Sequence, residues 1–559
     1  MFSEFAEFCE YLERFTERTR KVSALAEKLR LLDREYIRPF SLMIIGRVFP
    51  DWQQKSLDVS WSTIARIITG LFRVPRRELV EALKRTGDIG DAVKQLYEGR
   101  RILKQLTLLS TSEEITILDV FGMLNKIAEV KGEDSRARKE SMLYSLMSRM
   151  SSTELKILMR IIFSDMRHGV NVGILEEAIS KASGIPQHYI SRAYMITGDI
   201  GEVAELAICH GLDALRGIKI RIFHPVRPML AQKAESVRDA LREHGWLTAF
   251  EFKLDGLRAQ IHKKGDVARI YSRRLRDVTD SFPEIVEEIK NNVVVEEAVL
   301  EGEIIGFKDG KPIPFQELMK RVRRIEEFRK YMRRIPVQIY LFDILYLNGE
   351  MLIDKAYDER RRILKEVAGR LKLVPRIVTS DPNEAERFFK EAVSHGHEGL
   401  MAKRLDSKYT LGTRGKAWLK IKRTLEPLDC VIVAAEWGYG RRKKWLSDYY
   451  LAVRDTEKNE WVVVGKTFKG LTDQEFEEIT KRLLKDKLYE SGRTVFVRPR
   501  IVVEVIYDEI QKSPKYESGY ALRFARISRI RYDKTVDDAD TIDRVREIYN
   551  KQRRYKASI

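Results

Sequence analysis

The chain has 559 residues, of which 103 are Lys or Arg and 84 are Asp or Glu, giving a formal net charge of +19. A single hydrophobic core does not extend over this length, so we expect two to four domains. The excess of positive charge predicts a polyanionic partner, most simply nucleic acid, with an anionic membrane surface as the weaker alternative.

Membrane and secreted classes are disfavoured. No uninterrupted apolar run approaches the roughly 18 residues that a membrane span needs, and the N-terminus lacks the apolar core of a signal peptide. The three cysteines, Cys9, Cys209 and Cys430, lie too far apart in sequence to suggest a disulfide framework or a zinc site. We therefore expect a cytoplasmic protein.

Residues 1 to 220 are predicted to be helical. Apolar residues recur there at spacings of three and four, as in the series Phe5, Phe8, Cys9, Leu12 and Phe15. Short polar breaks, at Ser60, at Ser151-Ser152 and at Gly184-Ile185-Pro186, are typical of helix caps and turns.

This region contains an internal sequence repeat. The segment Thr86–Val93 (TGDIGDAV) returns as Thr197–Ala204 (TGDIGEVA), which suggests two related helical halves. Each Gly-Asp-Ile-Gly can end one helix and begin the next. The exposed N–H groups of such a helix start bind phosphate, and the alternative is a cap used twice for packing.

The segment Gln105–Leu109 (QLTLL) loosely resembles a sliding-clamp binding motif. It lacks the paired aromatic residues that such motifs often carry. An amphipathic segment of the helical core explains it equally well, so clamp binding is one of two interpretations.

The pattern changes after His224–Ala231, where two prolines indicate an extended linker. Strands alternating with helices follow. The candidate strands are Trp246–Phe252, Ala268–Tyr271, Val293–Ile305 and Val337–Tyr346.

The stretch Glu251–Arg258 (EFKLDGLR) lies at a predicted strand-to-turn corner. Alternation along a strand directs Lys253 and Asp255 to the same face, and Gly256 lets the backbone turn or approach a ligand closely. A lysine held in this way is a nucleophile if burial, neighbouring cations or a metal lower its pKa. The alternative is a β-turn with solvated charges.

Further charged motifs follow the lysine stretch in a fixed order. They are Ser272-Arg273-Arg274, Leu300-Glu301-Gly302-Glu303, Leu341-Phe342-Asp343, Glu398-Gly399-Leu400-Met401-Ala402-Lys403, Trp418-Leu419-Lys420-Ile421-Lys422 and Arg531-Tyr532-Asp533-Lys534. In this order and spacing the series resembles the covalent nucleotidyltransferases. The resemblance is strongest to ATP-dependent DNA ligases of the archaeal and eukaryotic replicative type, and it covers essentially the whole chain.

The resemblance implies a multidomain α+β protein. Residues 1–220 would form an all-α DNA-binding domain that grips a nicked duplex, and 221–423 a mixed α/β nucleotidyltransferase (ATP-grasp-like) domain for adenylation. Residues 424–559 would form an OB-fold β-barrel with a C-terminal helix. Short strands punctuated by glycines, with a helix at Thr472–Leu488 between them, fit the last assignment.

The resemblance also implies that Lys253 is the catalytic residue and that it accepts an adenylyl group from ATP. Cations must surround the phosphates. The nucleotide-binding cations would be Arg258, Arg273, Arg414, Lys420 and Lys422. No Gly-x-x-x-x-Gly-Lys-Ser/Thr loop is present, so we expect no Walker-type site.

The same resemblance assigns the remaining site residues. Glu303 and Glu398 supply the oxygen ligands that Mg²⁺ (or Mn²⁺) prefers, and Glu303 also reaches the nucleotide. Phe342 stacks on adenine, with a core phenylalanine as the alternative, and Glu251 contacts the adenine edge.

A closing movement is implied for the C-terminal part. Arg531 and Lys534 would be delivered to the ATP β- and γ-phosphates and then swing away about a hinge near Pro427 and Asp429 to admit DNA.

The implied function is a monomeric DNA ligase that seals nicks with a 5′-phosphate and a 3′-hydroxyl in replication, repair and recombination. The rivals are an RNA ligase or capping enzyme of the same superfamily, and a DNA-binding scaffold with an inactive site. The absence of a four-cysteine module disfavours an NAD-dependent ligase. The choice between ATP, ADP and NAD, and the preferred metal, stay open.

Overall fold

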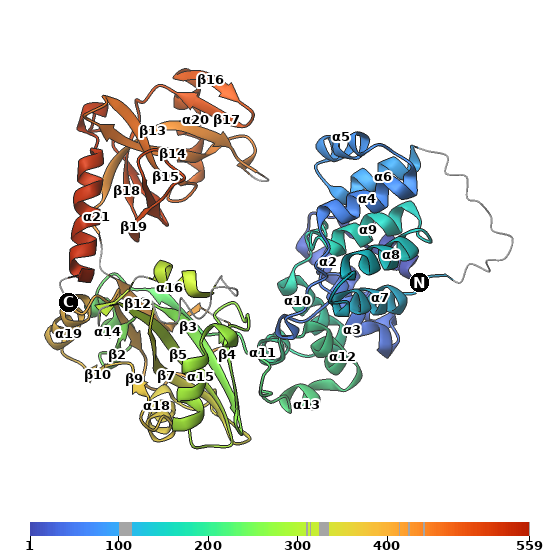
Figure 1. Ribbon diagram of the computed structural model, residues 1–559, viewed down its shortest axis with the longest axis horizontal. Helices are drawn as coiled ribbons and strands as arrows, with labels where there is room; N and C mark the ends of the chain where they lie inside the picture. Colours follow the sequence, from blue (N-terminus) through green and yellow to red (C-terminus); the bar gives the residue numbers. More distant parts are fainter. Residues whose placement is uncertain are drawn as a thin grey trace.

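The computed structural model has a helical N-terminal part, a middle part built on two sheets, and a β-rich C-terminal part (Figure 1). The described residues are 1–99, 114–308, 311–313, 315–322, 335–412, 414–422, 425–439 and 442–557. The candidate clamp motif Gln105–Leu109 lies outside them. None of the helices in these ranges combines the length and the apolar character that a membrane crossing requires.

The N-terminal part is all-helical, as the sequence predicts. Its elements are α1 (Phe2–Glu13), α2 (Arg18–Leu31), α3 (Arg34–Met43), η1 (Asp51–Gln53), α4 (Trp61–Phe72), α5 (Arg76–Thr86), α6 (Ile89–Glu98), α7 (Ile117–Glu129), α8 (Ser135–Met147), α9 (Ser152–Ile162), α10 (Val172–Ser183), α11 (Gln187–Thr197), α12 (Ile200–Cys209) and α13 (Gly211–Arg216). The predicted caps are confirmed. Ser60 caps α4, Ser151 forms a capping box at α9, and Gly184 ends α10 in the left-handed region that glycine tolerates.

The two Gly-Asp-Ile-Gly segments have the same local structure. Gly87 and Gly198 end a helix at φ values of +69° and +66°, and Asp88 and Asp199 then cap the next helix. A Cβ on the final glycine would lie 2.7 Å from a backbone carbonyl oxygen in both copies, that of Lys156 at Gly90 and that of Arg38 at Gly201.

Each capping aspartate is buried and pairs with an arginine from another helix. Asp199 binds Arg38 at 2.6 Å, and Asp88 binds Arg160 at 3.2 Å. Helix capping and close packing therefore account for the repeated motif, which favours the second of the two interpretations.

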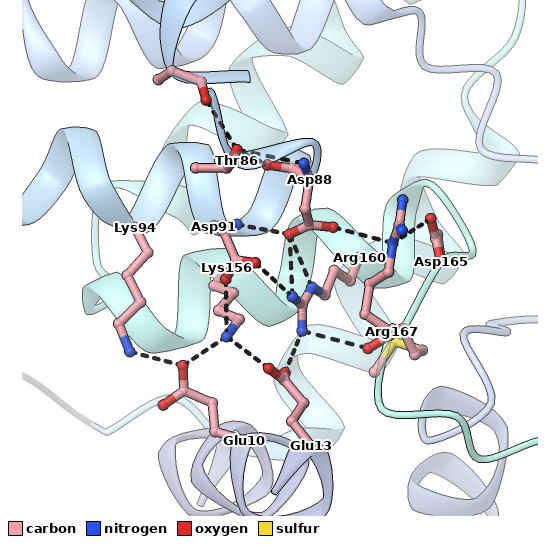
Figure 2. Close-up of polar contacts among 12 residues, drawn as sticks. Glu10, Glu13, Thr86, Asp88, Asp91, Lys94, Lys156, Arg160, Asp165 and Arg167 are labelled. Atoms are coloured by element: carbon pink, nitrogen blue, oxygen red, sulfur yellow. Dashed lines mark hydrogen bonds and ion pairs between the residues drawn. The ribbon is translucent and has the colours of Figure 1, made fainter. Parts of the chain in front are cut away.

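The ion pair of Asp88 and Arg160 is part of a larger ion network that joins α1, α6 and α9 (Figure 2). Lys156 lies 3.0 Å from Glu10, 3.1 Å from Glu13 and 3.0 Å from Asp91. Because opposite charges surround each buried cation, the desolvation cost of burying it is offset.

The middle part consists of two sheets with helices against them. The first sheet has the order β1 (Leu230–Lys233), β12 (Arg414–Lys422), β11 (Gly399–Lys403), β2 (Thr248–Lys253) and β10 (Arg376–Thr379). The second has the order β4 (Val267–Ser272), β3 (Leu257–Lys264), β5 (Glu297–Lys308), β7 (Val337–Leu347) and β8 (Glu350–Met351), with β6 (Lys311–Pro312) on β5 and β9 (Lys372–Leu373) on β7. The helices are α14 (Val237–Glu243), α15 (Pro283–Asn292), α16 (Phe315–Val322), α18 (Tyr357–Val367) and α19 (Pro382–Ser394).

Two predicted strand boundaries in this part are wrong. The strand predicted from Val293 begins at Glu297, because Val293 is the C-cap residue of α15. Trp246 was expected inside the strand that carries the lysine, but it has a φ of +67° and the strand begins at Thr248. Its backbone N–H instead donates to the carbonyl of Leu241 at the end of α14. A turn between α14 and β2 therefore occupies the position that the apolar run suggested for a strand.

The helical part and the middle part share one hydrophobic core. The apolar cluster of the helices continues without interruption into Val226, Met229, Tyr409 and Trp418. The nucleotidyltransferase motifs thus rest directly on the helical domain.

The C-terminal part is an OB-like sheet domain. Its elements are β13 (Leu428–Trp437), β14 (Leu446–Asp455), β15 (Glu460–Thr467), α20 (Asp473–Lys485), β16 (Lys487–Ser491), β17 (Thr494–Val497), β18 (Val502–Ile506), β19 (Glu509–Lys512), β20 (Tyr520–Arg523), β21 (Arg526–Ile530) and the long helix α21 (Ile542–Ala557).

The sheet pairs in the order β15-β14-β13-β17-β16, with β18 joined to β13 and β21. A backbone hydrogen bond of 3.0 Å from Ile527 to the Lys469 carbonyl links the far ends. Among the described residues the strand ladders form an open path, and the C-terminal domain has the OB-like sheet that the sequence predicts. The segment from Thr494 to Ile506 forms two strands, β17 and β18.

Candidate active site

Lys253 is the last residue of β2, a central strand of the first sheet. It pairs in register with Gly399 of β11, and the backbone N–H of Glu398 donates to the Lys253 carbonyl at 2.9 Å. The ladder therefore brings two motifs that are far apart in sequence to the same corner.

A three-member ion cluster forms at this corner. The ammonium nitrogen of Lys253 lies 2.7 Å from a Glu398 carboxylate oxygen, and that of Lys422 lies 2.9 Å from the same oxygen. Burial alone would raise the pKa of Glu398, but the two lysines outweigh it and lower that pKa to about 2.

The pKa of Lys253 is raised rather than lowered. Burial disfavours its ammonium form, but the carboxylates of Glu398, Glu303 and Asp255 favour that form more strongly. The lowered pKa that the sequence predicts for a nucleophilic lysine is therefore not found in this arrangement. In this arrangement the lysine is charged, and Glu398 must be drawn away before the amine can react.

Gly256 is required by the close approach that the sequence anticipated. A Cβ at this position would lie 2.3 Å from the Ile304 carbonyl oxygen and 3.0 Å from Cγ of Glu303. The turn after Lys253 thus presses against β5. This contact fixes the distance between the lysine corner and the carboxylate of Glu303.

Glu303 lies in register with Arg258 across the β3–β5 ladder. Burial raises the pKa of Glu303 to about 7, although Lys253 and Arg258 act in the opposite direction. A half-buried carboxyl beside Glu398 suits a divalent cation, which would restore its charged form. No cluster of three or more metal-binding side chains occurs in the described ranges. A bound Mg²⁺ would therefore rely on one or two carboxylates together with phosphate oxygens.

Arg258 is held from three sides. Its guanidinium donates to Glu301 at 2.7 Å, to the Met229 carbonyl at 2.7 Å and to the Tyr409 hydroxyl at 3.1 Å. Glu301 is buried and was not among the predicted site residues. Strand alternation was the available signal, because Glu301 and Glu303 are two apart on β5 and face the same side.

Three of the predicted cations, Arg273, Arg414 and Lys420, lie within electrostatic range of one another or of a shared neighbour. The pKa of Arg273 is lowered by burial and by the charges of Arg258 and Arg414. The pKa of Lys420 is lowered by burial and by the charges of Lys422 and Lys253. These pKa shifts place the predicted cations close together. Their mutual repulsion would be relieved by a bound polyanion.

An aromatic wall lies beside these cations. Phe342 is half-buried and meets Trp418 edge to face, with 6.3 Å between ring centroids. The Lys403 ammonium lies 4.7 Å from the Phe342 ring centroid and 4.3 Å from that of Trp418. Phe342 thus borders the site, and stacking on adenine stays a prediction.

Glu251 is already engaged within the protein. Lys403 lies 2.6 Å from one of its carboxylate oxygens, and the Tyr357 hydroxyl donates to the other at 2.5 Å. With all three residues buried, the structure gives Glu251 an internal role. A contact between Glu251 and the adenine edge stays a prediction.

The C-terminal domain meets the site through Asp508, which lies 3.3 Å from the Lys422 ammonium. A cavity of about 140 Å³ opens beside this pair. It is lined by Glu398 and His397 on one side and by Arg523 and Phe524 on the other.

Arg531 and Lys534 are not at this interface. Arg531 pairs with Asp429 at 3.1 Å and with Asp533 at 2.7 Å, while Lys534 pairs with Asp429 at 2.5 Å. In this arrangement the structure therefore does not bring the last predicted motif to the site. Their carboxylate partners belong to the C-terminal domain itself, so only a rotation of that domain would deliver them.

Three family models match successive parts of the chain. "DNA ligase N terminus" matches residues 1–178, "ATP dependent DNA ligase domain" matches 228–422, and "ATP dependent DNA ligase C terminal region" matches 442–534. The match to the middle model contains Lys253, Glu303, Glu398 and Lys422.

Relatives match over the full length. The chain is 43% identical over 560 residues to the DNA ligase of Thermococcus fumicolans, covering 100% of this chain and 99% of that one. It is also 43% identical over 558 residues to DNA ligase 1 of Korarchaeum cryptofilum (strain OPF8), covering 99% of both chains. The solved structure named Pmar-Lig_PreS3 covers 94% of this chain and 99% of its own at a TM-score of 0.56 and 18% identity, which supports the fold. The chain belongs to the ATP-dependent DNA ligase family.

Proposed function

We infer that this protein is an ATP-dependent DNA ligase that joins 5′-phosphate and 3′-hydroxyl ends at nicks in duplex DNA. The observation that carries this inference is the corner at the end of β2. There Lys253 lies against Glu398, and burial and the positive charges of Lys422 and Lys253 lower the pKa of Lys420 beside them. A nucleophile next to clustered positive charge suits attack on a phosphate.

In the first step the neutral amine of Lys253 attacks the α-phosphorus of ATP. A P–N bond forms, the bond to the bridging oxygen breaks, and pyrophosphate leaves with that electron pair. The ammonium gives up one proton to become the neutral amine, and the nitrogen loses a second proton to solvent as the P–N bond forms. Arg258, Arg273, Arg414, Lys420 and Lys422 hold the nucleotide phosphates by charge, while Phe342 and Glu251 contact the base.

Glu303 and Glu398 are the residues that would hold Mg²⁺ or Mn²⁺. A divalent cation bound there supplies charge neutralisation at the phosphates. The raised pKa of Glu303 supports this assignment, because the fold leaves that carboxyl without enough positive charge around it. Drawing Glu398 away from Lys253 would also favour the free amine.

The second and third steps occur on DNA. The 5′-phosphate at the nick attacks the lysyl-AMP and releases Lys253, and the 3′-hydroxyl then displaces AMP. We assign residues 1–220 to gripping the duplex, 221–423 to the adenylation chemistry and 424–559 to closing over it. With a net charge of +19, we expect mainly phosphate contacts and hence sequence-independent binding.

We propose that the closing domain rotates between steps. In one position it presents Asp508 to Lys422, as here, and in another it brings Arg531 and Lys534 to the ATP phosphates. We place the hinge at Pro427 and Asp429. The residue that now holds both cations, Asp429, follows the first residue of β13 directly.

Further assignments follow from the sequence. We propose a monomer in a reducing, cytoplasmic compartment, since Cys9, Cys209 and Cys430 are all free thiols. Binding to a sliding clamp through Gln105–Leu109 is part of the same proposal.

A sealing assay tests the function. A labelled 5′-phosphate at a nick in DNA, in RNA and in a hybrid duplex should be joined in DNA with ATP and Mg²⁺. Preferential joining of RNA ends would favour the RNA ligase alternative, and binding without joining would favour a scaffold.

Affinity for the nick should fall steeply with salt as counterions are released. A flat salt profile would contradict binding through phosphate contacts.

A further inference from the structure

A residue of the helical domain reaches the turn that carries Arg273. Gln54 follows η1 and has a φ of +53°. Its side-chain amide nitrogen donates to the Leu275 carbonyl at 2.5 Å, and its side-chain oxygen accepts from the Asp277 N–H at 3.1 Å. One side chain thus binds two backbone groups of the same turn across the domain boundary.

The turn is strained and depends on such contacts. Ser272 donates its N–H to the Arg276 carbonyl at 2.8 Å, and Leu275 donates to the Ser272 carbonyl at 2.7 Å. Leu275 has a φ of +61°, an unfavourable conformation for a leucine. Arg273 stands at the tip of this turn, so the geometry of the turn decides where the guanidinium lies.

The loop that carries Gln54 is itself fixed. The Trp52 ring stacks on the His224 ring with 3.8 Å between centroids and 14° between planes. On the helical side, a Cβ on Gly198 would lie 3.5 Å from Cδ1 of Trp52. Gly198 belongs to the second Gly-Asp-Ile-Gly segment. A continuous packed path therefore runs from the corner between α11 and α12, through Trp52 and Gln54, to the turn.

Arg273 belongs to the cation group of the site. Besides burial, the charges of Arg258 and Arg414 lower its pKa and that of Glu303 raises it, so Arg273 lies within electrostatic range of all three. Displacing the turn would move Arg273 relative to these groups and to the nucleotide phosphates.

We propose that Gln54 is a positioning residue for adenylyl transfer: the helical domain, through this side chain, holds the turn Ser272–Asp277 and so places Arg273 in the nucleotide site. The proposal rests on the proposed function, because it assumes that Arg273 contacts the nucleotide. It gives the helical domain a part in the first step, in which no DNA takes part.

The test uses Gln54→Met in the full-length protein. Methionine keeps the length of the side chain and removes both hydrogen bonds. In single-turnover adenylylation without DNA we expect a rise in the KM for ATP and a fall in rate, together roughly five- to tenfold for two lost hydrogen bonds. Gln54→Glu keeps the acceptor for Asp277 but sets a carboxylate against the Leu275 carbonyl, so we expect at least the same loss.

Arg192→Ala is the matched control. Arg192 pairs with Asp354 at 2.5 Å across the same pair of domains and does not touch the turn. It should leave adenylylation unchanged. An equal loss in Arg192→Ala would mean that domain docking in general, and not the turn, sets the rate, and it would overturn the proposal.

A double-mutant cycle with Arg273→Ala separates positioning from a general structural effect. If Gln54 acts through Arg273, Gln54→Met should add little to the loss already caused by Arg273→Ala. Independent, multiplying effects would overturn the proposal, as would an unchanged rate in Gln54→Met. Wild-type protein that forms no adenylate would instead reject the proposed function.

Discussion

The ammonium nitrogen of Lys253 lies 2.7 Å from the carboxylate of Glu398, and this contact raises the pKa of the residue that must act as the nucleophile. The same carboxylate is a proposed metal ligand. Binding of nucleotide and metal would therefore release the lysine from its ion pair at the moment when its free amine is needed.

This relationship predicts a pH dependence for the first step. Below the pKa of Lys253 the neutral amine is scarce, so the adenylylation rate should rise about tenfold per pH unit. Glu398→Gln removes the largest favourable charge around the ammonium and should move this rising limb to lower pH, whatever it does to the maximum rate. Single-turnover adenylylation at subsaturating ATP, which reports the free enzyme, measures it between pH 6 and about 10.

The control for that shift is Glu477→Gln, a surface change in α20 whose partner is Lys481. It should leave the profile in place. A limb that stays at the same pH in Glu398→Gln would show that Glu398 does not control the protonation of the lysine.

Replacing Glu303 with glutamine should increase the free energy of unfolding at alkaline pH. Its pKa in the fold is about 7, above its ordinary value, so the folded state binds more protons than the unfolded state between about pH 4.5 and 7. Its contribution to stability is therefore lost as pH rises through this window. Glu303→Gln should raise the free energy of unfolding by about 1 to 3 kcal/mol at pH 8 without nucleotide or metal, and by little at pH 4.

Thermal unfolding at the two pH values measures this difference, with the exposed Glu386→Gln as control. The stabilised Glu303 variant should lose adenylylation, since the carboxylate is needed in the reaction. A variant equally stable at both pH values would mean that Glu303 is not under electrostatic stress.

Local features of the site were predictable from the sequence, whereas contacts between distant segments were not. The close approach at Gly256 was foreseen because a glycine after a strand signals it, and the structure confirms the contact with Ile304. The pairing of Lys253 with Glu398 depends on the register between β2 and β11, which sequence spacing does not give. Gln54 was missed because it is an exposed residue whose partners lie in another domain.

The positions of Arg531 and Lys534 depend on how two domains are oriented. Both residues belong to one sequence motif. The motif does not predict that Asp429 forms ion pairs with both of them. Similarly, Glu251 contacts both Lys403 and Tyr357, and the three residues come from separate segments of the chain. Such contacts are properties of the assembled fold.

The proposed rotation predicts a defect confined to one step. Arg531→Ala and Lys534→Ala should slow adenylylation and spare the sealing of a nick that already carries AMP on its 5′-phosphate. Arg529→Ala is the control, because Arg529 is an exposed neighbour that pairs with Glu504 at 2.8 Å. Single-turnover rates with ATP and with pre-adenylylated DNA separate the two steps.

A physical change of shape must accompany that kinetic result. Small-angle scattering of the free, ATP-bound and nick-bound protein should give different profiles. Identical profiles, or equal losses in both steps, would contradict the rotation.

The buried pair of Asp343 and Arg360 should matter for stability. Arg360 donates to the two carboxylate oxygens of Asp343 at 2.8 and 3.0 Å, and both side chains are fully buried. Asp343→Ala leaves an uncompensated charge beside Phe342, so the free energy of unfolding should fall by about 3 to 5 kcal/mol.

Denaturant unfolding measures this loss. Lys481→Ala in the exposed pair with Glu477 should show no measurable change by comparison. A similarly small effect for both variants would mean that the Asp343 site can admit water or rearrange.

The most direct test of the account is labelling with α-labelled ATP and Mg²⁺, comparing the wild-type protein with Lys253→Ala. The protein must first be shown to be free of bound AMP. We predict an acid-labile covalent label on the wild type only, which is chased onto the 5′-phosphate of nicked DNA. A label that persists in Lys253→Ala, or no label on the wild type, would contradict the assignment of Lys253 as the nucleophile that accepts AMP.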